Sequence, residues 1–304
     1  MTMKLKGNIP VIPTPFVNGK VEYEGFDRLI ERTIDHVEGY VVCGSTGEAP
    51  ALTLSERRDI VRYLARKLPS GKEMVVGLGH TCLEEAIEIG HAAVESGVKA
   101  ALVPSPYYFP NSLAMVIDFV GTLALRTGLK VVFYDNPVTT NTRFTTDDLI
   151  QLSEAIPQVE AIKMTDHRFD KIRELKERTT LTVFGGDDII CFRAFTAGVD
   201  GNMIIAPIIY PEAFRQCWQL HCKGEYELSF GLYSQVLLPF ISMFGPGDEI
   251  PTTKALFHHL GIFASAETRI PLLPADERRV REVITGYEQA FKAADGGKKG
   301  KGER

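Results

Sequence analysis

Eight apolar runs recur along the chain, and each is followed by a segment with helical periodicity. Most of the runs are continuously apolar rather than alternating, as in strands of a parallel sheet that are buried on both faces. They lie at residues 8–16, 40–46, 73–79, 100–106, 130–136, 159–165, 181–187 and 201–207. Eight strand–helix units in succession predict an α/β fold, a (β/α)₈ TIM barrel.

The segments between the runs carry recognisable helix signals. In residues 54–68 the apolar side chains recur on one face, and in residues 83–97 the final Gly97 stands where glycine commonly ends a helix. Thr145 opens the sequence TTDDL, which would cap a helix and place two acids in its first turn. A doubly wound open sheet is the alternative fold, but no GxGxxG motif follows the first run.

After the eighth run the chain contains only helical segments. These segments cover residues 211–224, 227–245, 252–261 and 275–294. We therefore expect a barrel core at residues 1–210 and a C-terminal helical extension packed on it at residues 211–294. Residues 295–304, DGGKKGKGER, are too polar and glycine-rich to pack and should form a disordered tail.

Composition excludes several classes of function. The net charge of −5 gives no footprint for nucleic acid. The chain has no apolar run of membrane-spanning length, and its first residues lack the apolar core of a signal peptide, so we expect no membrane association and a cytoplasmic location. Five cysteines without a CxxC pair indicate reduced thiols, and without HExxH or a similar histidine motif we expect no metal.

Polar residues gather where the predicted strands end. In barrels of this kind, catalytic side chains lie at the carboxyl ends of the strands, which share one mouth. Five such ends are GSTGE (44–48), PSPYY (104–108), FYDNP (133–137), KMTD (163–166) and FGGDD (184–188). Each also has a structural explanation, namely a turn, barrel packing by Tyr107 or Tyr108, or helix capping by Asp187 or Asp188.

Lys163 is the most informative of these residues because it lies in an apolar run, VEAIKMT. It could simply extend its ammonium group to water at the strand end. A desolvated pocket, however, disfavours the charged form and leaves a neutral amine that can attack a ketone. The resulting Schiff base is an electron sink that needs neither PLP nor a metal. A nearby tyrosine could move the protons, and the Gly44–Gly47 loop could hold the carboxylate of a 2-oxo acid such as pyruvate.

The same motifs resemble those of the dihydrodipicolinate synthase/N-acetylneuraminate lyase family. The resemblance runs from about residue 7 to residue 290 and rests on GSTGEAPALTLSER, FYDNP, AIKMTD, FGGDD, AGVDGNMIIAPIIYP, PTTKALFHHLGIF and RIPLLP. It implies a (β/α)₈ lyase that acts on pyruvate or another 2-oxo acid through a Schiff-base lysine, without a cofactor. It also implies a homotetramer built as a dimer of dimers.

The resemblance assigns roles to individual residues. Lys163 would form the imine, Tyr134 would relay protons, and Ser45 would stand beside it in the relay. Thr46 would bind the substrate carboxylate, and Tyr108 would enter the site of the neighbouring subunit. The remaining substrate-binding residues would be Gly47, Thr139, Gly186, Asp187, Asp188 and, through its backbone carbonyl, Met203.

The chain departs from the family pattern at Thr139. Dihydrodipicolinate synthases resemble YNxPxRT here, and their arginine binds a second carboxylate, whereas this chain reads YDNPVTTN, with Asp135 for the asparagine and Arg143 four residues further on. Its GGDD also differs from the GYDE-like loop of sialic acid lyases. A dihydrodipicolinate synthase-like enzyme is the first interpretation, and a 2-keto-3-deoxy sugar-acid aldolase or dehydratase is the alternative. A non-catalytic 2-oxo acid binding protein would be expected to have lost Lys163 or Tyr134, and both are present.

Overall fold

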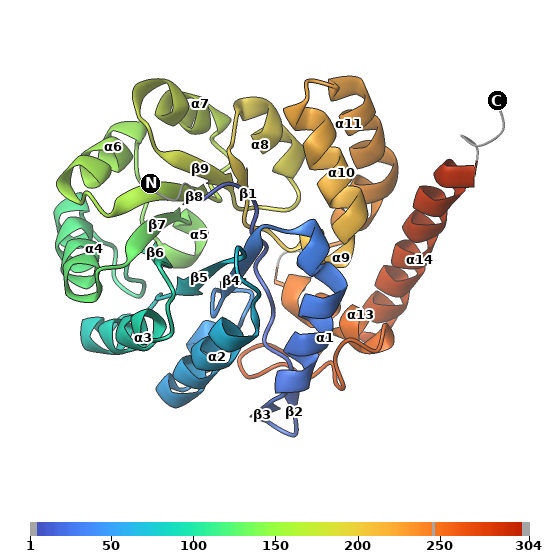
Figure 1. Ribbon diagram of the computed structural model, residues 1–304, viewed down its shortest axis with the longest axis horizontal. Helices are drawn as coiled ribbons and strands as arrows, with labels where there is room; N and C mark the ends of the chain where they lie inside the picture. Colours follow the sequence, from blue (N-terminus) through green and yellow to red (C-terminus); the bar gives the residue numbers. More distant parts are fainter. Residues whose placement is uncertain (1–4, 245–246, 300–304) are drawn as a thin grey trace. The chain divides into compact units, whose positions relative to one another are not determined.

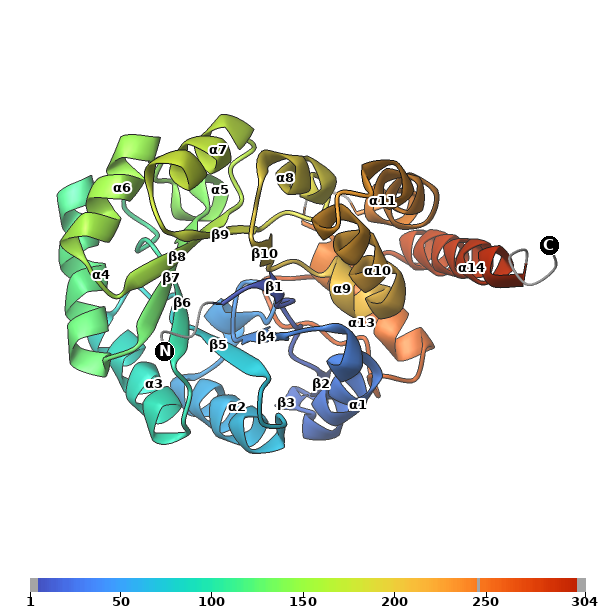
Figure 2. The same ribbon diagram turned by 45° about the horizontal axis from the view of Figure 1, so that its top comes forward.

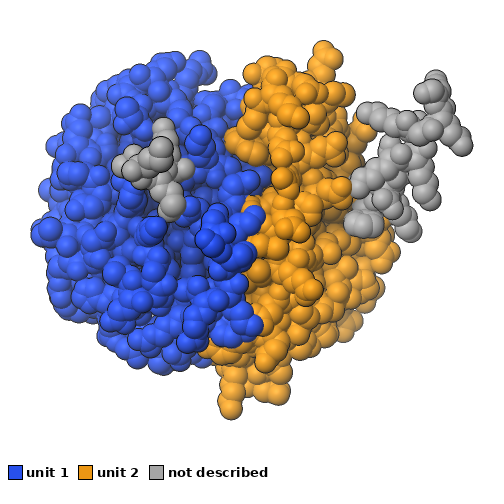
Figure 3. Space-filling view, viewed as in Figure 1, with its two compact units in different colours: residues 1–12, 38–204 blue, residues 13–37, 205–304 orange. Residues whose placement is uncertain are grey.

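The computed structural model describes residues 5–244 and 247–299 (Figure 1) and divides into two compact units (Figure 3). The first unit comprises Met1–Ile12 and Glu38–Ile204, and the second comprises Pro13–Val37 and Ile205–Arg304. All eight strands of the main sheet belong to the first unit. The helices that follow the last strand belong to the second.

The main sheet is parallel and nearly closed into a barrel. Its strands are β1 (Gly7–Asn8), β4 (Gly39–Val42), β5 (Glu73–Gly77), β6 (Ala100–Pro104), β7 (Lys130–Asp135), β8 (Val159–Met164), β9 (Thr182–Gly185) and β10 (Gly201–Asn202). They are ordered β1-β10-β9-β8-β7-β6-β5-β4. A bridge between Val11 and Val41, with the Ile12 amide 3.1 Å from the Val41 carbonyl, joins the two ends of this order. The predicted (β/α)₈ barrel is confirmed.

Helices of the first unit follow the strands in turn and lie outside the sheet (Figure 1, Figure 2). They are η2 (Ala49–Ala51), α2 (Leu54–Lys67), α3 (Leu83–Glu95), α4 (Leu113–Thr127), α5 (Pro137–Thr140), α6 (Thr146–Ala155), α7 (Phe169–Arg178) and α8 (Cys191–Ala197). The predicted cap at Thr145 is present, because its hydroxyl accepts the Asp148 amide at 3.1 Å. Gly97, just beyond α3, adopts a φ of 83°.

The second unit begins with a hairpin that the sequence did not predict. We expected one strand over residues 8–16, but Pro10, Pro13 and Pro15 remove amide donors from it, and only its first residues join the barrel. Phe16–Val17 (β2) instead pairs with Lys20–Val21 (β3). Asn18 and Gly19 between them have φ values of 51° and 75°, as a tight hairpin turn requires.

The rest of the second unit is helical, as predicted for the C-terminal extension. Its elements are α1 (Tyr23–Thr33), η1 (Ile34–His36), α9 (Ala206–Ile209), α10 (Pro211–Cys222), α11 (Tyr226–Leu232), η3 (Tyr233–Leu237), α12 (Leu238–Ile241), α13 (Glu249–His259) and α14 (Glu277–Lys299). Helix α14 includes the first residues of the tail expected at 295–304, and residues 300–304 lie outside the described residues. None of the described helices is long and apolar enough to cross a membrane.

The seam between β1 and β10 depends on close backbone contact at Gly201. A Cβ atom added there would lie 2.1 Å from the Gly7 carbonyl oxygen of the neighbouring strand. We predict that Gly201→Ala lowers the free energy of unfolding by about 3 kcal/mol, measured by urea denaturation. Gly231→Ala is the matched control, since a Cβ there meets nothing within 4 Å. It should stabilise α11 by up to about 1 kcal/mol, and equal effects of the two changes would refute this account of the seam.

Candidate active site

A register shift between β7 and β8 brings the two central residues of the site together. Val131 pairs with Val159, but Val132 pairs with Ala161, so Glu160 is passed over. Tyr134 consequently stands opposite Lys163, whereas an unshifted register would place it opposite Ile162. Paired residues of neighbouring strands point to the same face of a sheet. The Lys163 Nζ atom lies 4.2 Å from the centroid of the Tyr134 ring.

Lys163 is buried without a counter-ion. Its exposed fraction is 4%, and among the described residues no acidic side chain lies within ion-pair distance of it. Buried lysines are usually paired with an acidic side chain, and Lys163 lacks one among the described residues. Gly186 provides the space, because a Cβ atom there would lie 2.9 Å from the Lys163 Cε atom and 2.7 Å from the Thr165 hydroxyl.

The Tyr134 hydroxyl is held by a residue that sequence reasoning missed. Asn136, which is 5% exposed, donates its Nδ2–H to the phenol oxygen at 2.9 Å. Its Oδ1 atom accepts the Thr139 amide at 3.4 Å and so caps α5. An asparagine directly before a proline is a common start of a helix, and that signal in FYDNP could have identified the cap.

The GSTGE loop presents backbone amides at the end of β4. Its turn is tight, because Cys43 and Glu48 adopt φ values of 53° and 55°, which non-glycine residues seldom do. Ser45 is exposed, Thr46 is half-buried and Gly47 is buried. Within the described part of the chain, the amides of Ser45 and Thr46 have no hydrogen-bond acceptor. Two such amides in one turn form a concavity suited to a carboxylate.

Residues from the ends of β9 and β10 lie on the same side of the barrel. The Asp187 carboxylate accepts the Ile189 amide at 2.9 Å and lies 3.1 Å from His167 Nε2, while Asp188 is half-buried. The following helix, α8, begins at Cys191 with Ile190 at its N-cap, so neither Asp187 nor Asp188 is the N-cap residue. Met203 is fully buried, and its carbonyl accepts no hydrogen bond from any described residue.

Tyr108 and Thr139 are both exposed. Tyr108 is 83% exposed and has a φ of 92°, a strained conformation for an aromatic residue. Its ring packs edge-on against Phe109, itself 69% exposed, with the ring centroids 5.0 Å apart. Thr139 lies on the outer side of α5, whereas the neighbouring Thr140 hydroxyl donates to the Asn136 carbonyl at 2.8 Å.

A buried ionic cluster lies next to Tyr134 in the sequence. Lys171 on α7 donates to Asp135 at 2.7 Å and to Asp166 at 3.0 Å, and it thereby ties the end of β7 to the loop after β8. Asp135 and Lys171 are both almost fully buried. Burial raises the pKa of Asp135, and the Lys171 ammonium opposes this rise. The sequence pointed to Asp135 as unusual but not to its partner on α7.

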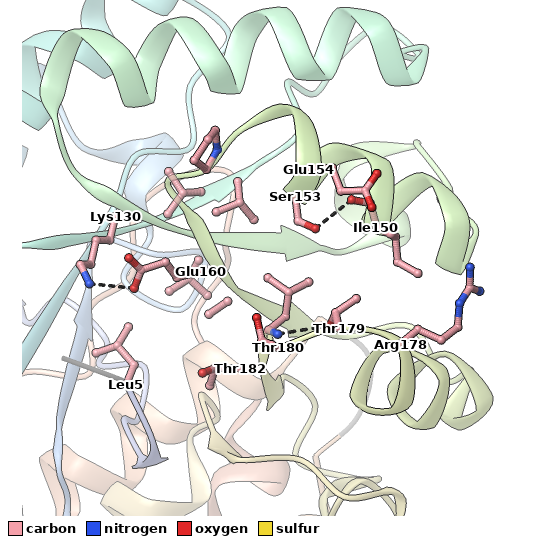
Figure 4. Close-up of a pocket in the computed structure, with 16 residues that line it drawn as sticks. Leu5, Lys130, Ile150, Ser153, Glu154, Glu160, Arg178, Thr179, Thr180 and Thr182 are labelled. Carbon is pink, nitrogen blue, oxygen red and sulfur yellow. Dashed lines mark hydrogen bonds and ion pairs between the residues drawn. The ribbon is translucent and has the colours of Figure 1, made fainter. Parts of the chain in front are cut away.

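A separate cavity of about 610 Å³ lies at the amino-terminal ends of β7, β8 and β9 (Figure 4). Both of its cationic side chains are already paired, with Lys130 bound to Glu160 at 2.7 Å and Arg178 bound to Asp147 at 2.6 Å. In barrel enzymes this end of the strands serves stability, and catalysis occurs at the other. We therefore assign the candidate site to the end that carries Lys163.

Comparisons with known proteins agree with one another. The model of the Dihydrodipicolinate synthetase family matches residues 4–290. A 4-hydroxy-tetrahydrodipicolinate synthase from Hydrogenobaculum sp. (strain Y04AAS1) is 28% identical over 288 residues, which cover 93% of this chain and 99% of the relative. The enzyme of the same name from Phenylobacterium zucineum (strain HLK1) is 29% identical over 290 residues, covering 94% and 97%.

A solved structure shares the fold. It is the 4-hydroxy-tetrahydrodipicolinate synthase from the thermoacidophilic methanotroph Methylacidiphilum fumariolicum SolV. The TM-score is 0.90 at 24% sequence identity, and the match covers 95% of this chain and 97% of the other. The fold of this chain is therefore a known one.

We predict that Lys171→Met destabilises the protein in a pH-dependent way. Removing one partner of a buried ion pair costs about 3 to 5 kcal/mol. Burial raises the pKa of Asp135, so the stability that its protonated form contributes is present at low pH and is lost as the pH rises through that value. Lys171 opposes the rise in the pKa of Asp135, so its removal raises that pKa further and enlarges the stability lost at high pH. The destabilisation by Lys171→Met should therefore be greater at pH 8 than at pH 5.

The measurement is urea denaturation at both pH values. Lys130→Met is the control, because the Lys130–Glu160 pair is partly exposed and should contribute about 1 kcal/mol or less at either pH. A Lys171→Met penalty that is equal at the two pH values, or no larger than that of the control, would contradict the prediction.

Proposed function

The chain belongs to the dihydrodipicolinate synthetase family of Schiff-base lyases, and from this membership we propose that Lys163 forms an imine with pyruvate or a related 2-oxo acid. The protein is a lyase of the class I aldolase type. The observation that carries the proposal is the burial of Lys163 without a counter-ion, beside the ring of Tyr134. A lysine that only stabilised the fold would be expected to have an acidic partner, as Lys171 does.

The reaction begins with attack by the neutral Lys163 amine on the keto carbon. The C–N bond forms as the carbonyl π electrons move to oxygen, which takes a proton from the Tyr134 hydroxyl. The nitrogen then returns a proton to Tyr134. In the second stage Tyr134 gives its proton to the hydroxyl group, which leaves as water while the nitrogen lone pair forms the C=N bond. The remaining N–H proton then returns to the phenolate, which restores Tyr134. Ser45 would take part in this relay beside Tyr134.

The remaining residues would hold the substrate. The free amides of Ser45 and Thr46, with the Thr46 hydroxyl and the Gly47 backbone, suit its carboxylate. The buried Met203 carbonyl lacks a hydrogen-bond donor and could accept one from the bound substrate. Gly186, Asp187 and Asp188 would contact the part of the substrate beyond the imine.

The exposed aromatic pair supports an oligomer. Tyr108 and Phe109 together form an apolar projection beside the site, and such a projection is more typical of an interface than of a free surface. Tyr108 would complete the relay of a neighbouring subunit in a homotetramer built as a dimer of dimers. The described cysteines are all free, which agrees with a cytoplasmic location.

The second substrate is the open choice within this chemistry. The names of the relatives favour a 4-hydroxy-tetrahydrodipicolinate synthase-like condensation with an aldehyde that carries its own carboxylate. One observation favours a sugar-acid aldolase or dehydratase instead. The exposed Thr139 occupies the position at which the YNxPxRT motif of the synthases has its arginine. A threonine hydroxyl cannot form the bidentate ion pair of a guanidinium group.

We predict that borohydride added with pyruvate reduces a covalent adduct onto Lys163. Mass spectrometry of the intact chain and of its peptides should locate one pyruvyl increment on this residue. Lys163→Ala should give neither adduct nor turnover, whereas Lys130→Ala, a change at the opposite ends of the strands, should retain both. An adduct that persists in Lys163→Ala would refute the assignment.

We predict that Thr139→Arg changes the choice of second substrate. A hydrogen bond to a charged group contributes about 1.5 to 3 kcal/mol, so kcat/KM for aspartate semialdehyde should rise by about 10- to 150-fold. The value for a polyhydroxylated 2-oxo acid should fall. Thr139→Lys is the control, because it adds a positive charge without the bidentate guanidinium group. It should raise kcat/KM for aspartate semialdehyde by less than Thr139→Arg. If the unaltered protein already condenses pyruvate with aspartate semialdehyde at a typical enzymatic rate, the sugar-acid alternative is excluded.

A further inference from the structure

We infer that Asn136 is a positioning residue of the proton relay, which orients the Tyr134 hydroxyl toward the reacting lysine. The inference rests on the proposed function, since it assumes that Tyr134 moves protons during imine formation. It is carried by a buried hydrogen bond, 2.9 Å long, between Asn136 Nδ2 and the Tyr134 oxygen.

The orientation of the Asn136 amide follows from its two partners. The Thr139 amide is a donor, and Oδ1 is the only acceptor of the Asn136 side chain, so the Oδ1 atom must face the Thr139 amide. The Nδ2 atom then faces Tyr134, and the Asn136 group is a donor in that bond. With 5% of its surface exposed, Asn136 is shielded from water that could compete for the phenol oxygen.

This direction of donation determines what the phenol can do. Because Tyr134 accepts a hydrogen bond from Asn136, its own proton takes no part in that bond and remains free for the oxygen of the attacked carbonyl. When the proton has been transferred, the amide still donates to the phenolate oxygen that is left. A bond to a charged oxygen is stronger than one to a neutral oxygen, so the contact gains strength during the reaction.

A purely structural role for Asn136 explains less of the geometry. The cap contact to Thr139 is 3.4 Å long, near the limit for a hydrogen bond, whereas the contact to Tyr134 is of ideal length. The α5 turn also has other support, since Pro137 fixes the backbone at its first position and the Thr140 amide and hydroxyl both bind the Asn136 carbonyl. The cap at Thr145 shows the contrast, because its capping bonds involve only Asp148.

The link also joins the relay to the region that we propose for substrate selection. Thr139 donates its amide to Asn136, and Asn136 donates to Tyr134, so one side chain connects α5 with the phenol. A substrate group that displaces α5 would therefore disturb the proton relay. Specificity and rate would change together.

The test uses Asn136→Asp, which keeps the oxygen that caps α5 but replaces the donor with a second acceptor. The phenol would then give its own proton to the carboxylate. Asn136→Leu, which removes both contacts at similar volume, and Thr145→Ala, which removes a cap remote from the site, complete the set. The readouts are the rate at which borohydride-trapped pyruvyl adduct accumulates, kcat, and the midpoint of urea denaturation. Asn136→Asp and Asn136→Leu are also made in the Tyr134→Phe background.

Asn136→Asp should slow adduct formation by about 10- to 100-fold with little change in the denaturation midpoint. Thr145→Ala should lower the midpoint and leave adduct formation unchanged. In the Tyr134→Phe background the Asn136 changes should have less than about a 3-fold effect, because the group through which Asn136 acts is absent.

Two results would overturn the inference alone. One is an Asn136→Asp variant that forms the adduct at close to the normal rate. The other is an equal slowing with and without the Tyr134 hydroxyl, which would make Asn136 a support of the backbone only. Failure of the unaltered protein to form any adduct at Lys163 would instead overturn the proposed function, and this inference with it.

Discussion

The whole site depends on the way β8 skips one residue as it pairs with β7. Parallel strands hold their partners by evenly spaced hydrogen bonds, and a shift of one residue exchanges the faces to which side chains point. Because Glu160 is passed over, Lys163 pairs with Tyr134 and the two side chains lie on the same face of the sheet. Glu160 itself binds Lys130 near the amino-terminal ends of the strands. The register of the two strands near their amino-terminal ends therefore determines which side chains meet at the mouth of the barrel.

Two buried lysines show how surroundings determine what one residue type does. Lys171 has two carboxylates and is a structural cation that joins β7 to the loop after β8. Lys163 is buried to a similar degree and has only the face of an aromatic ring. The cost of desolvation is met in the first case by ion pairing, and in the second no acidic side chain of the described residues offsets it. The same residue type is therefore ion-paired at position 171 and faces an aromatic ring at position 163.

The sequence allowed the barrel, the helical extension and the rim residues to be predicted because they depend on periodicity and on local motifs. Lys163 and Tyr134 were identified as candidates in this way. Contacts between distant segments were not. Helix α2 was recognised by its apolar spacing, but Arg57 on it is buried and donates to the Gly77 and Gly79 carbonyls, which no local pattern reveals. The same applies to Lys171, and to Asn136, whose amide could be read as a cap but not as a partner of Tyr134. The hairpin after β1 was not predicted because the apolar run at residues 8–16 is typical of a strand, although its prolines cannot donate hydrogen bonds within a sheet.

The shortness of β1 and β10 has a consequence for how the barrel moves. Each contributes two residues to the sheet, and beyond them the seam continues through single backbone hydrogen bonds, such as the Ile9 amide to the Asn202 carbonyl and the Val41 amide to the Pro10 carbonyl, whereas β7 and β8 form five residue pairs. Local opening of a structure begins where the fewest hydrogen bonds must break. Amide hydrogens along this seam would therefore exchange with solvent sooner than those of β6 to β8. The barrel would open on one side while the strands that carry Lys163 and Tyr134 stay paired.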